Sequence, residues 1–242
     1  MMRKVAQIMG MPISIDIPDC RKSTVFEAVF DELRAIGDRF SPYKDDSEVS
    51  RFARGELKLS ETSADFKAVK QACDKWQKTT QGFFSAYFDK RFNPTGYVKG
   101  WAIKRAGEVI SGQGYKTFCV GAGGDILARG NKTWRVGIQN PKVPDQIVGL
   151  VELKNGAVAT SGTSERGAHI INPKTGKPPA GFLSLSVVGR DIITADVLAT
   201  AAFAAGKAGP SLLISQPGYE FLGVINEGNF IASSPKRFGL SA

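Results

Sequence analysis

Apolar residues recur with two different periods along this chain, and the changes of period mark out the expected elements. Over 23–40, 60–77 and 98–111 they return every three to four positions, which predicts three amphipathic helices. The third helix is expected to end at Gly112 or Gly114, because glycine commonly follows the last helical residue.

The first two helices carry start signals. Thr24 and Glu27 have the spacing of a capping box at the first. Thr62 or Ser63 is expected to cap the second, since a short hydroxyl side chain can accept a free amide of the first turn. The stretch "FSPYKDDSEVSRF" (40–52) predicts a loop followed by a short turn of helix.

Strand patterns dominate elsewhere. "KVAQIMGMPISIDI" (4–17) alternates in period two and predicts one or two strands, interrupted at Gly10 and Pro12. From Thr117 onward, short β-rich runs alternate with turns. These runs are "FCVGAGGDI", "TWRVGI", "IVGLVEL", "GAVATSG", "HIINP" and "LSLSVVG".

The last part of the chain adds a helix and a hairpin. The Ala-rich stretch 194–206 is expected to be a buried helix closed by Gly206, and 218–233 a hairpin that turns at 227–229. Strands and helices therefore intermix, with a sheet-rich second half. This order predicts an α+β fold with a mixed or antiparallel sheet, rather than a doubly wound parallel one.

Composition adds a preference for anionic partners. The 242 residues are 42% hydrophobic, enough for a sizeable core, and 32 Lys and Arg against 23 Asp and Glu give a net charge of +9. Such an excess suits a nucleotide or a phosphate-bearing cofactor. The basic residues form no run of five and do not interleave with aromatics, which disfavours nucleic acid as a partner.

Cysteine usage and the first residues bear on location. The three cysteines are odd in number and lack C-x-x-C spacing, which argues against a disulfide framework and a zinc knuckle. The opening apolar stretch is broken by Gln7 and Gly10 and soon reaches Asp16, so it lacks the form of a secretion signal. No stretch approaches eighteen consecutive apolar residues. We therefore expect a cytoplasmic protein that does not span a membrane.

Two basic or glycine-rich stretches are candidates for phosphate contact. "VGAGGDI" (120–126) places glycines in a turn after a strand, where bare backbone amides can approach a phosphate or a flat ring. It lacks the full G-x-G-x-x-G spacing, so a purely structural turn is the rival interpretation. Lys99, between Gly96 and Gly100, lies near a helix start suited to anions, and a solvated surface lysine is its rival interpretation.

Asp196 and Thr200 lie four residues apart, hence on one face of an otherwise apolar helix. A carboxylate and a hydroxyl are hard oxygen ligands of the kind that Mg²⁺ takes beside substrate phosphates. In the rival interpretation Asp196 is a first-turn charge meeting the helix dipole, and Thr200 bonds back to its own helix.

His169 is the only histidine, and it precedes "IINP". Its ordinary pKa suits it to accept a proton near neutral pH, although a lone histidine is more often structural. The nearby "TSGTS" (160–164) raises the alternative of a Ser-His-acid hydrolase, but no G-x-S-x-G elbow is present.

Taken in order, these stretches resemble the ApbE-type flavin transferases, which move FMN from FAD onto a threonine of a target protein. The resemblance covers nearly the whole chain. It rests on "MGMPISI", "FSPYKDDSEVSRF", "GYVKGWAI", "GAGGDI", "WRVGIQNP", "GAVATSGTSER", "HIINPKTGKP" and "TADVLATAAFAAG". It implies one α+β, T-fold-like domain over 1–242, with a cleft for FAD between its subregions.

The resemblance also implies roles for residues. His169 matches the general base, which would deprotonate the acceptor threonine, with AMP as the leaving group. Asp196, Thr200 and the backbone carbonyl of Val98 match the positions that hold Mg²⁺. The matches to the FAD cleft are Met9, Tyr43, Lys99, Gly123, Gly124, Asp125, Thr160, Ser161 and Gly162. Glu48 and Arg51 are expected to be structural.

Three positions depart from the family pattern. Asn172 stands where "HIIDP" has Asp, Gly121 where an Asn precedes "AGGD", and Lys104 where an acid follows "KG". The segment before "NPTGYVKG" is also shortened. Two other functions stay open: a Mg²⁺-dependent FAD pyrophosphatase releasing FMN and AMP, and a protein that binds FAD without cleaving it.

Overall fold

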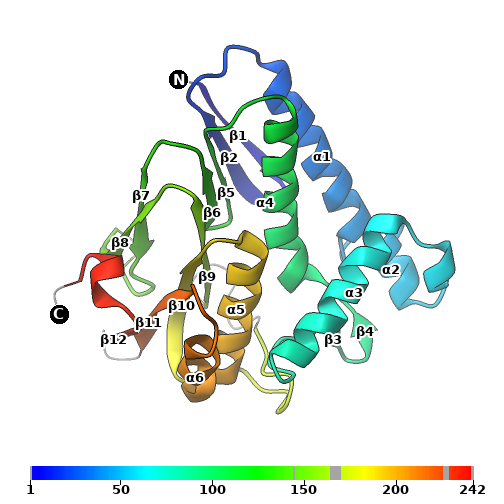
Figure 1. Cartoon of the computed structure of the whole chain (residues 1–242). Coiled ribbons are helices and arrows are strands. Elements are labelled where there is room, and N and C mark those ends of the chain that lie inside the picture. Colours follow the sequence, from blue (N-terminus) through cyan, green and yellow to red (C-terminus); the bar gives the residue numbers. More distant parts are fainter. Residues whose placement is uncertain (1, 144, 164–169, 226–228, 241–242) are drawn as a thin grey trace.

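The computed structural model describes residues 2–143, 145–163, 170–225 and 229–240. Within this part of the chain, an eight-stranded sheet with the order β1-β2-β5-β6-β9-β10-β11-β12 runs through the molecule (Figure 1). All of its pairings are antiparallel. The strands are β1 (Met2–Ile8), β2 (Met11–Ile17), β5 (Phe118–Ala122), β6 (Asp125–Arg129), β9 (Gly156–Gly162), β10 (Phe182–Gly189), β11 (Glu220–Ile225) and β12 (Phe230–Ala232).

Three helices cover one face of this sheet: α1 (Thr24–Phe40), α4 (Thr95–Gly112) and α5 (Ile192–Ala205). Alternate residues of β2 and β5 are buried against them, as the period-two pattern requires. α1 and α4 lie side by side over the strands β1, β2 and β5, and α5 packs against β9 and β10 (Figure 1).

The remaining helices extend this layer. They are α2 (Glu48–Ala53), α3 (Ala64–Thr79) and α6 (Gly209–Ile214), with short 3₁₀ turns at Leu59–Glu61 and Gly206–Ala208. A further 3₁₀ turn, Pro235–Phe238, packs on the other face of the sheet against β8 (Ile147–Leu153). A small hairpin of β3 (Tyr87–Phe88) and β4 (Arg91–Phe92) lies next to α2 and α3. Phe40, Phe52, Phe66 and Phe92 pack ring against ring there and hold this part together.

The opposite face of the second half of the sheet is covered by a separate hairpin, β7 (Trp134–Gln139) with β8 (Ile147–Leu153). Val158 and Val188 point to this side and form a second apolar cluster with Val136, Val151 and Leu153. Their sequence neighbours, such as Ala159 and Val187, belong to the helix-side core. The two clusters are therefore separated by the sheet itself.

The structure confirms the α+β fold with an antiparallel sheet flanked by helices. It also confirms the Ser63 cap, whose hydroxyl accepts the amide of Phe66 at 3.2 Å. The capping box at Thr24 is wrong: Ser23 is the N-cap and makes no side-chain cap bond. Glu27 instead pairs with Lys4 across to β1 at 3.0 Å.

"HIINP" is not a strand over its described residues. Ile170 and Ile171 have no strand partner, and Asn172 makes an isolated bridge with Lys177. His169 lies outside the described residues. The terminal hairpin is confirmed as β11 and β12, although 226–228 of its turn are also outside them.

The Ala-rich helix is confirmed as α5, and Gly206 ends it with a φ of 60°. The stretch Ile192–Ile214 is long and apolar enough to cross a membrane by length and composition, but 56% of its 18-residue apolar window is buried inside the fold. Its small side chains let α5 pack against α4 on one side and against β9 and β10 on the other. Most apolar residues of this stretch therefore belong to the core of the fold.

Candidate functional site

A large cleft opens at one end of the sheet, where two tight hairpin turns meet. Its cavity volume is about 1460 Å³. The β1–β2 turn is Met9-Gly10 and the β5–β6 turn is Gly123-Gly124, and all four residues have positive φ. Because the start of β2 pairs with the end of β5, the two turns lie at the same end of the strands, and both line the cleft.

Positive φ is routine for glycine but strained for Met9, whose φ is 56°. Gly123 is needed for a second reason. A Cβ at this position would lie 3.0 Å from the Met11 sulfur. The glycine turn therefore packs against the Met11 side chain, which would have to shift to admit a larger residue at position 123.

A buried charge cluster forms the floor of the cleft. The Lys99 ammonium, from the second turn of α4, lies 2.8 Å from Asp125 Oδ2 at the start of β6. It lies 3.4 Å from Asp196 Oδ1 on α5. The Asp125 side chain is fully buried and the Asp196 side chain is 3% exposed.

Each carboxylate also accepts a backbone amide. Asp125 Oδ1 takes the amide of Thr160 on β9 at 3.0 Å, and Asp196 Oδ2 takes the amide of Gly100 at 2.8 Å. Gly100 leaves the room for this contact, since a Cβ there would lie 3.1 Å from Ile193 Cα. The cluster thus ties α4, α5, β6 and β9 together.

Burial changes the protonation of the cluster. Burial raises the pKa of the Asp125 carboxyl to about 7, against the opposing effect of the Lys99 ammonium. Burial raises the pKa of Asp196 in the same way. Burial lowers the pKa of Lys99, but the two carboxylates outweigh that effect, so its pKa lies above the ordinary value. Lys99 therefore stays protonated, whereas burial favours the neutral form of the two carboxyls and the Lys99 charge opposes it.

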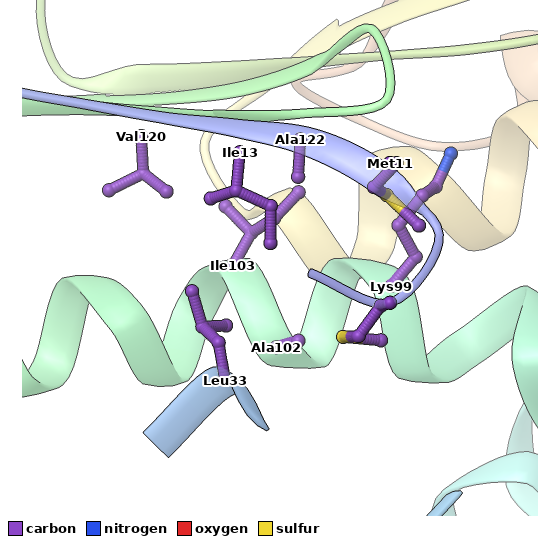
Figure 2. A pocket seen from close by; sticks show the side chains of 9 residues that line it. Met11, Ile13, Leu33, Lys99, Ala102, Ile103, Val120 and Ala122 are labelled. Carbon is purple, nitrogen blue, oxygen red and sulfur yellow. The ribbon is translucent and has the colours of Figure 1, made fainter. Parts of the chain in front are cut away.

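Figure 2 shows how Lys99 reaches this position. Its aliphatic stem rises from α4 past Met11, and its nitrogen ends beyond the apolar layer formed with Ile13, Ile103 and Val120. A cavity of about 10 Å³ lies in this layer, with no polar surface to hold a water. Because its stem is packed in this layer, the Lys99 ammonium has little freedom to move away from the two carboxylates.

The three residues predicted to bind a metal lie in one cleft. Val98, Asp196 and Thr200 all line the same cleft. Thr200 Oγ1 lies 3.2 Å from Ser161 Oγ, so Thr200 uses its hydroxyl across the cleft toward β9. Asp191 is the N-cap of α5 and Asp196 lies deeper in the helix, so the first-turn interpretation of Asp196 is wrong.

Most residues predicted to bind the cofactor lie in the cleft lining. They are Met9, Tyr43, Lys99, Gly123, Gly124, Thr160, Ser161 and Gly162. Asp125 is different, because it lies behind the lining, fully buried under Lys99. The catalytic prediction, His169, falls outside the described residues and stays a prediction. Glu48 is structural as expected: its carboxylate accepts the amide and hydroxyl of Ser63.

Sequence reasoning missed two cleft features. Ser184 on β10 lines the cleft with a buried hydroxyl that has no hydrogen-bond partner within the described part of the chain. Lys174 sets its ammonium 3.9 Å from the ring centre of Phe83, which also lines the cleft. The alternating pattern of β10 could have flagged Ser184, but no local signal links Lys174 to Phe83.

The family model of the ApbE family matches residues 9–93 and 89–222, which is most of the chain. The chain belongs to the ApbE family. Among its relatives, the FAD:protein FMN transferase of Rhodobacter capsulatus is 31% identical over 159 residues, 60% of this chain and 30% of that protein. The FAD:protein FMN transferase of Vibrio cholerae is 32% identical over 124 residues, 46% of this chain and 37% of that protein. The aligned part thus spans about a third of these curated relatives.

Solved ApbE structures share the fold. The ApbE protein of Thermotoga maritima superposes with a TM-score of 0.84 at 24% identity, covering 96% of this chain and 97% of that one. The flavin transferase ApbE of Vibrio cholerae gives 0.81 at 23% identity, covering 98% of both. At these identities the likeness establishes the fold alone.

The structure accounts for the departures from the ApbE pattern. Asn172 Oδ1 accepts the amide of Lys174 at 2.9 Å, a turn that an Asp would make equally well. A Cβ at Gly121 would lie 2.9 Å from the hydroxyl of its cross-strand partner Ser14. Lys104 is exposed on α4 and is not among the residues that line the cleft. None of the three changes the charge cluster.

Proposed function

We propose that this protein transfers FMN from FAD to a threonine hydroxyl of an acceptor protein, in a Mg²⁺-dependent reaction that releases AMP. The observation that carries the proposal is the meeting of Asp196, Thr200 and Lys99 on the floor of one large cleft. Membership of the ApbE family and the names of its relatives support it.

The donor set fits a hard divalent cation. Asp196, Thr200 and the Val98 carbonyl supply oxygen ligands, and the described residues contain no group of three or more His, Cys, Asp or Glu side chains that could hold a metal alone. Mg²⁺ commonly binds through one or two carboxylates and substrate phosphates. When bound, it would neutralise charge that develops on the pyrophosphate.

The chemistry is an in-line exchange at phosphorus. The threonine Oγ forms a bond to the FMN-side phosphorus, the bond from that phosphorus to the bridging oxygen breaks, and AMP leaves with the bonding pair. The hydroxyl proton passes to a base, for which we propose His169. The Lys99 ammonium at the cleft floor favours the anionic substrate.

The cleft also has features that suit the rest of FAD. Tyr43 stands at its edge with 91% of its surface exposed, available to stack on a flat ring. The Ser184 hydroxyl, which has no partner among the described residues, offers a hydrogen bond inside the cleft. We propose that FAD occupies this cleft and that the acceptor reaches its mouth. A cytoplasmic location remains a prediction.

Product analysis tests the proposal. The protein is incubated with FAD and Mg²⁺, with and without an acceptor carrying a target threonine, beside His169→Ala. AMP release with FMN bound covalently to the acceptor, lost in the variant, is expected. Free FMN and AMP without labelled acceptor would replace the proposal with a pyrophosphatase, and intact FAD would leave a binding protein.

A further inference from the structure

We propose that Asp125 is a positioning residue that holds the Lys99 ammonium away from Asp196 and thereby sets the affinity of the Asp196–Thr200 site for a divalent cation. This inference rests on the proposed function for the identity of that site. It concerns a residue behind the cleft lining, whose buried carboxyl interacts with Asp196 directly as well as through Lys99.

The geometry shows which carboxylate holds Lys99. The ammonium is at 2.8 Å from Asp125 and at 3.4 Å from Asp196, so the shorter contact is with Asp125. The second oxygen of Asp125 accepts the Thr160 amide at 3.0 Å, which fixes the carboxylate from its other side. Asp125 is thus an anchored acceptor, and Lys99 is drawn toward it.

This arrangement leaves an oxygen of Asp196 able to bind a cation. Its Oδ2 accepts the Gly100 amide, whereas its Oδ1 lies 3.4 Å from the Lys99 ammonium, farther than the Asp125 oxygen does. Without the Asp125 charge, Lys99 would pair with Asp196 alone. The Asp196 oxygen that is proposed to bind the metal would then lie close to the Lys99 ammonium, which repels a metal ion.

The charge count gives the expected effect. When both carboxyls are ionised, two carboxylates and one ammonium give the cluster a charge of −1, which attracts a divalent cation. Asp125→Asn would bring it to 0, and Lys99→Met to −2. Even at the dielectric of water, a unit charge roughly 6 Å from a divalent ion changes affinity about tenfold.

Four proteins test this: wild type, Asp125→Asn, Lys99→Met and the double variant, titrated with Mn²⁺ at pH 8 and followed by the free-Mn²⁺ EPR signal. Asp125→Asn keeps an oxygen for the Thr160 amide. We expect it to raise the Kd at least tenfold. Lys99→Met is expected to lower the Kd, and the double variant, back at −1, to return to within about threefold of wild type. Glu56→Gln, which removes an exposed charge, is the control and should leave the Kd unchanged.

The rescue separates positioning from a structural role. A double variant that binds as weakly as Asp125→Asn would overturn the inference, and so would an unchanged Kd in Asp125→Asn. If Asp125→Asn does not fold by circular dichroism, Lys99→Met alone decides, because an affinity equal to or below that of wild type contradicts the charge argument. Wild type that binds no Mn²⁺ overturns it too. The expected Mn²⁺ pattern without FMN transfer would refute only the proposed function.

Discussion

Gly100→Ala probes the contact between α4 and α5 that builds the site. A Cβ at residue 100 would lie 3.0 Å from Asp196 Oδ2 and 3.1 Å from both Asp196 Cβ and Ile193 Cα. The last of these is backbone, so it cannot move aside by a change of rotamer. The new methyl group must therefore push the two helices apart or displace the Asp196 carboxylate.

The magnitude follows from two opposing effects. Replacing glycine by alanine within a helix gains about 1 kcal/mol of helix propensity. Overpacking costs about 1–3 kcal/mol, and weakening the 2.8 Å bond from the Gly100 amide to a carboxylate costs about another 1.5–3 kcal/mol. We expect a net loss of about 2–4 kcal/mol in the free energy of unfolding.

The matched control is Gly112→Ala at the end of the same helix. A Cβ there meets nothing within 4 Å and the residue has no positive φ, so this variant should be as stable as wild type or slightly more so. Urea unfolding followed by circular dichroism gives both values at a common m-value. Equal stability of the two variants would refute the account of the α4–α5 contact.

Three further predictions concern single side chains. Burial raises the pKa of the Cys119 thiol to about 12, so DTNB at pH 8 should label it only slowly in the native protein and readily in guanidinium; rapid native labelling would contradict this. Lys174→Met removes the cation from the Phe83 ring and should weaken FAD binding several-fold, whereas Lys174→Arg should not. Tyr43→Ala should leave the urea midpoint unchanged, because the ring is 91% exposed, while raising the Kd for FAD; a lower midpoint would refute that reading.

The elements of this fold follow largely from periodicity. The sequence predicts α1, α3 and α4 from apolar residues at helical spacing and α5 from its Ala-rich apolar run, and it predicts the two glycine-containing turns at the cleft. It does not predict which side of the sheet the β7–β8 hairpin covers. That choice depends on one end of β9 and β10, where apolar residues point to both faces: Ala159 and Val187 to one, Val158 and Val188 to the other.

The sequence predicts individual residues of the site but not the contacts between them. Asp196 and Thr200 are visible as a helical pair, but the partner of Asp196 comes from α4 and that of Lys99 from β6. Spacing along one element carries no information about such contacts between elements. For the same reason the sequence predicts Asp125 in the cleft wall, whereas in the structure Asp125 is buried behind Lys99.

The most direct test of the account is a crystal structure with Mn²⁺ and FAD, using anomalous diffraction to locate the metal. We expect an anomalous peak within bonding distance of Asp196 and Thr200, next to the FAD pyrophosphate, with Lys99 still paired to Asp125. A metal bound elsewhere in the described cleft, or FAD outside it, would contradict the assignment of this cluster as the reaction centre.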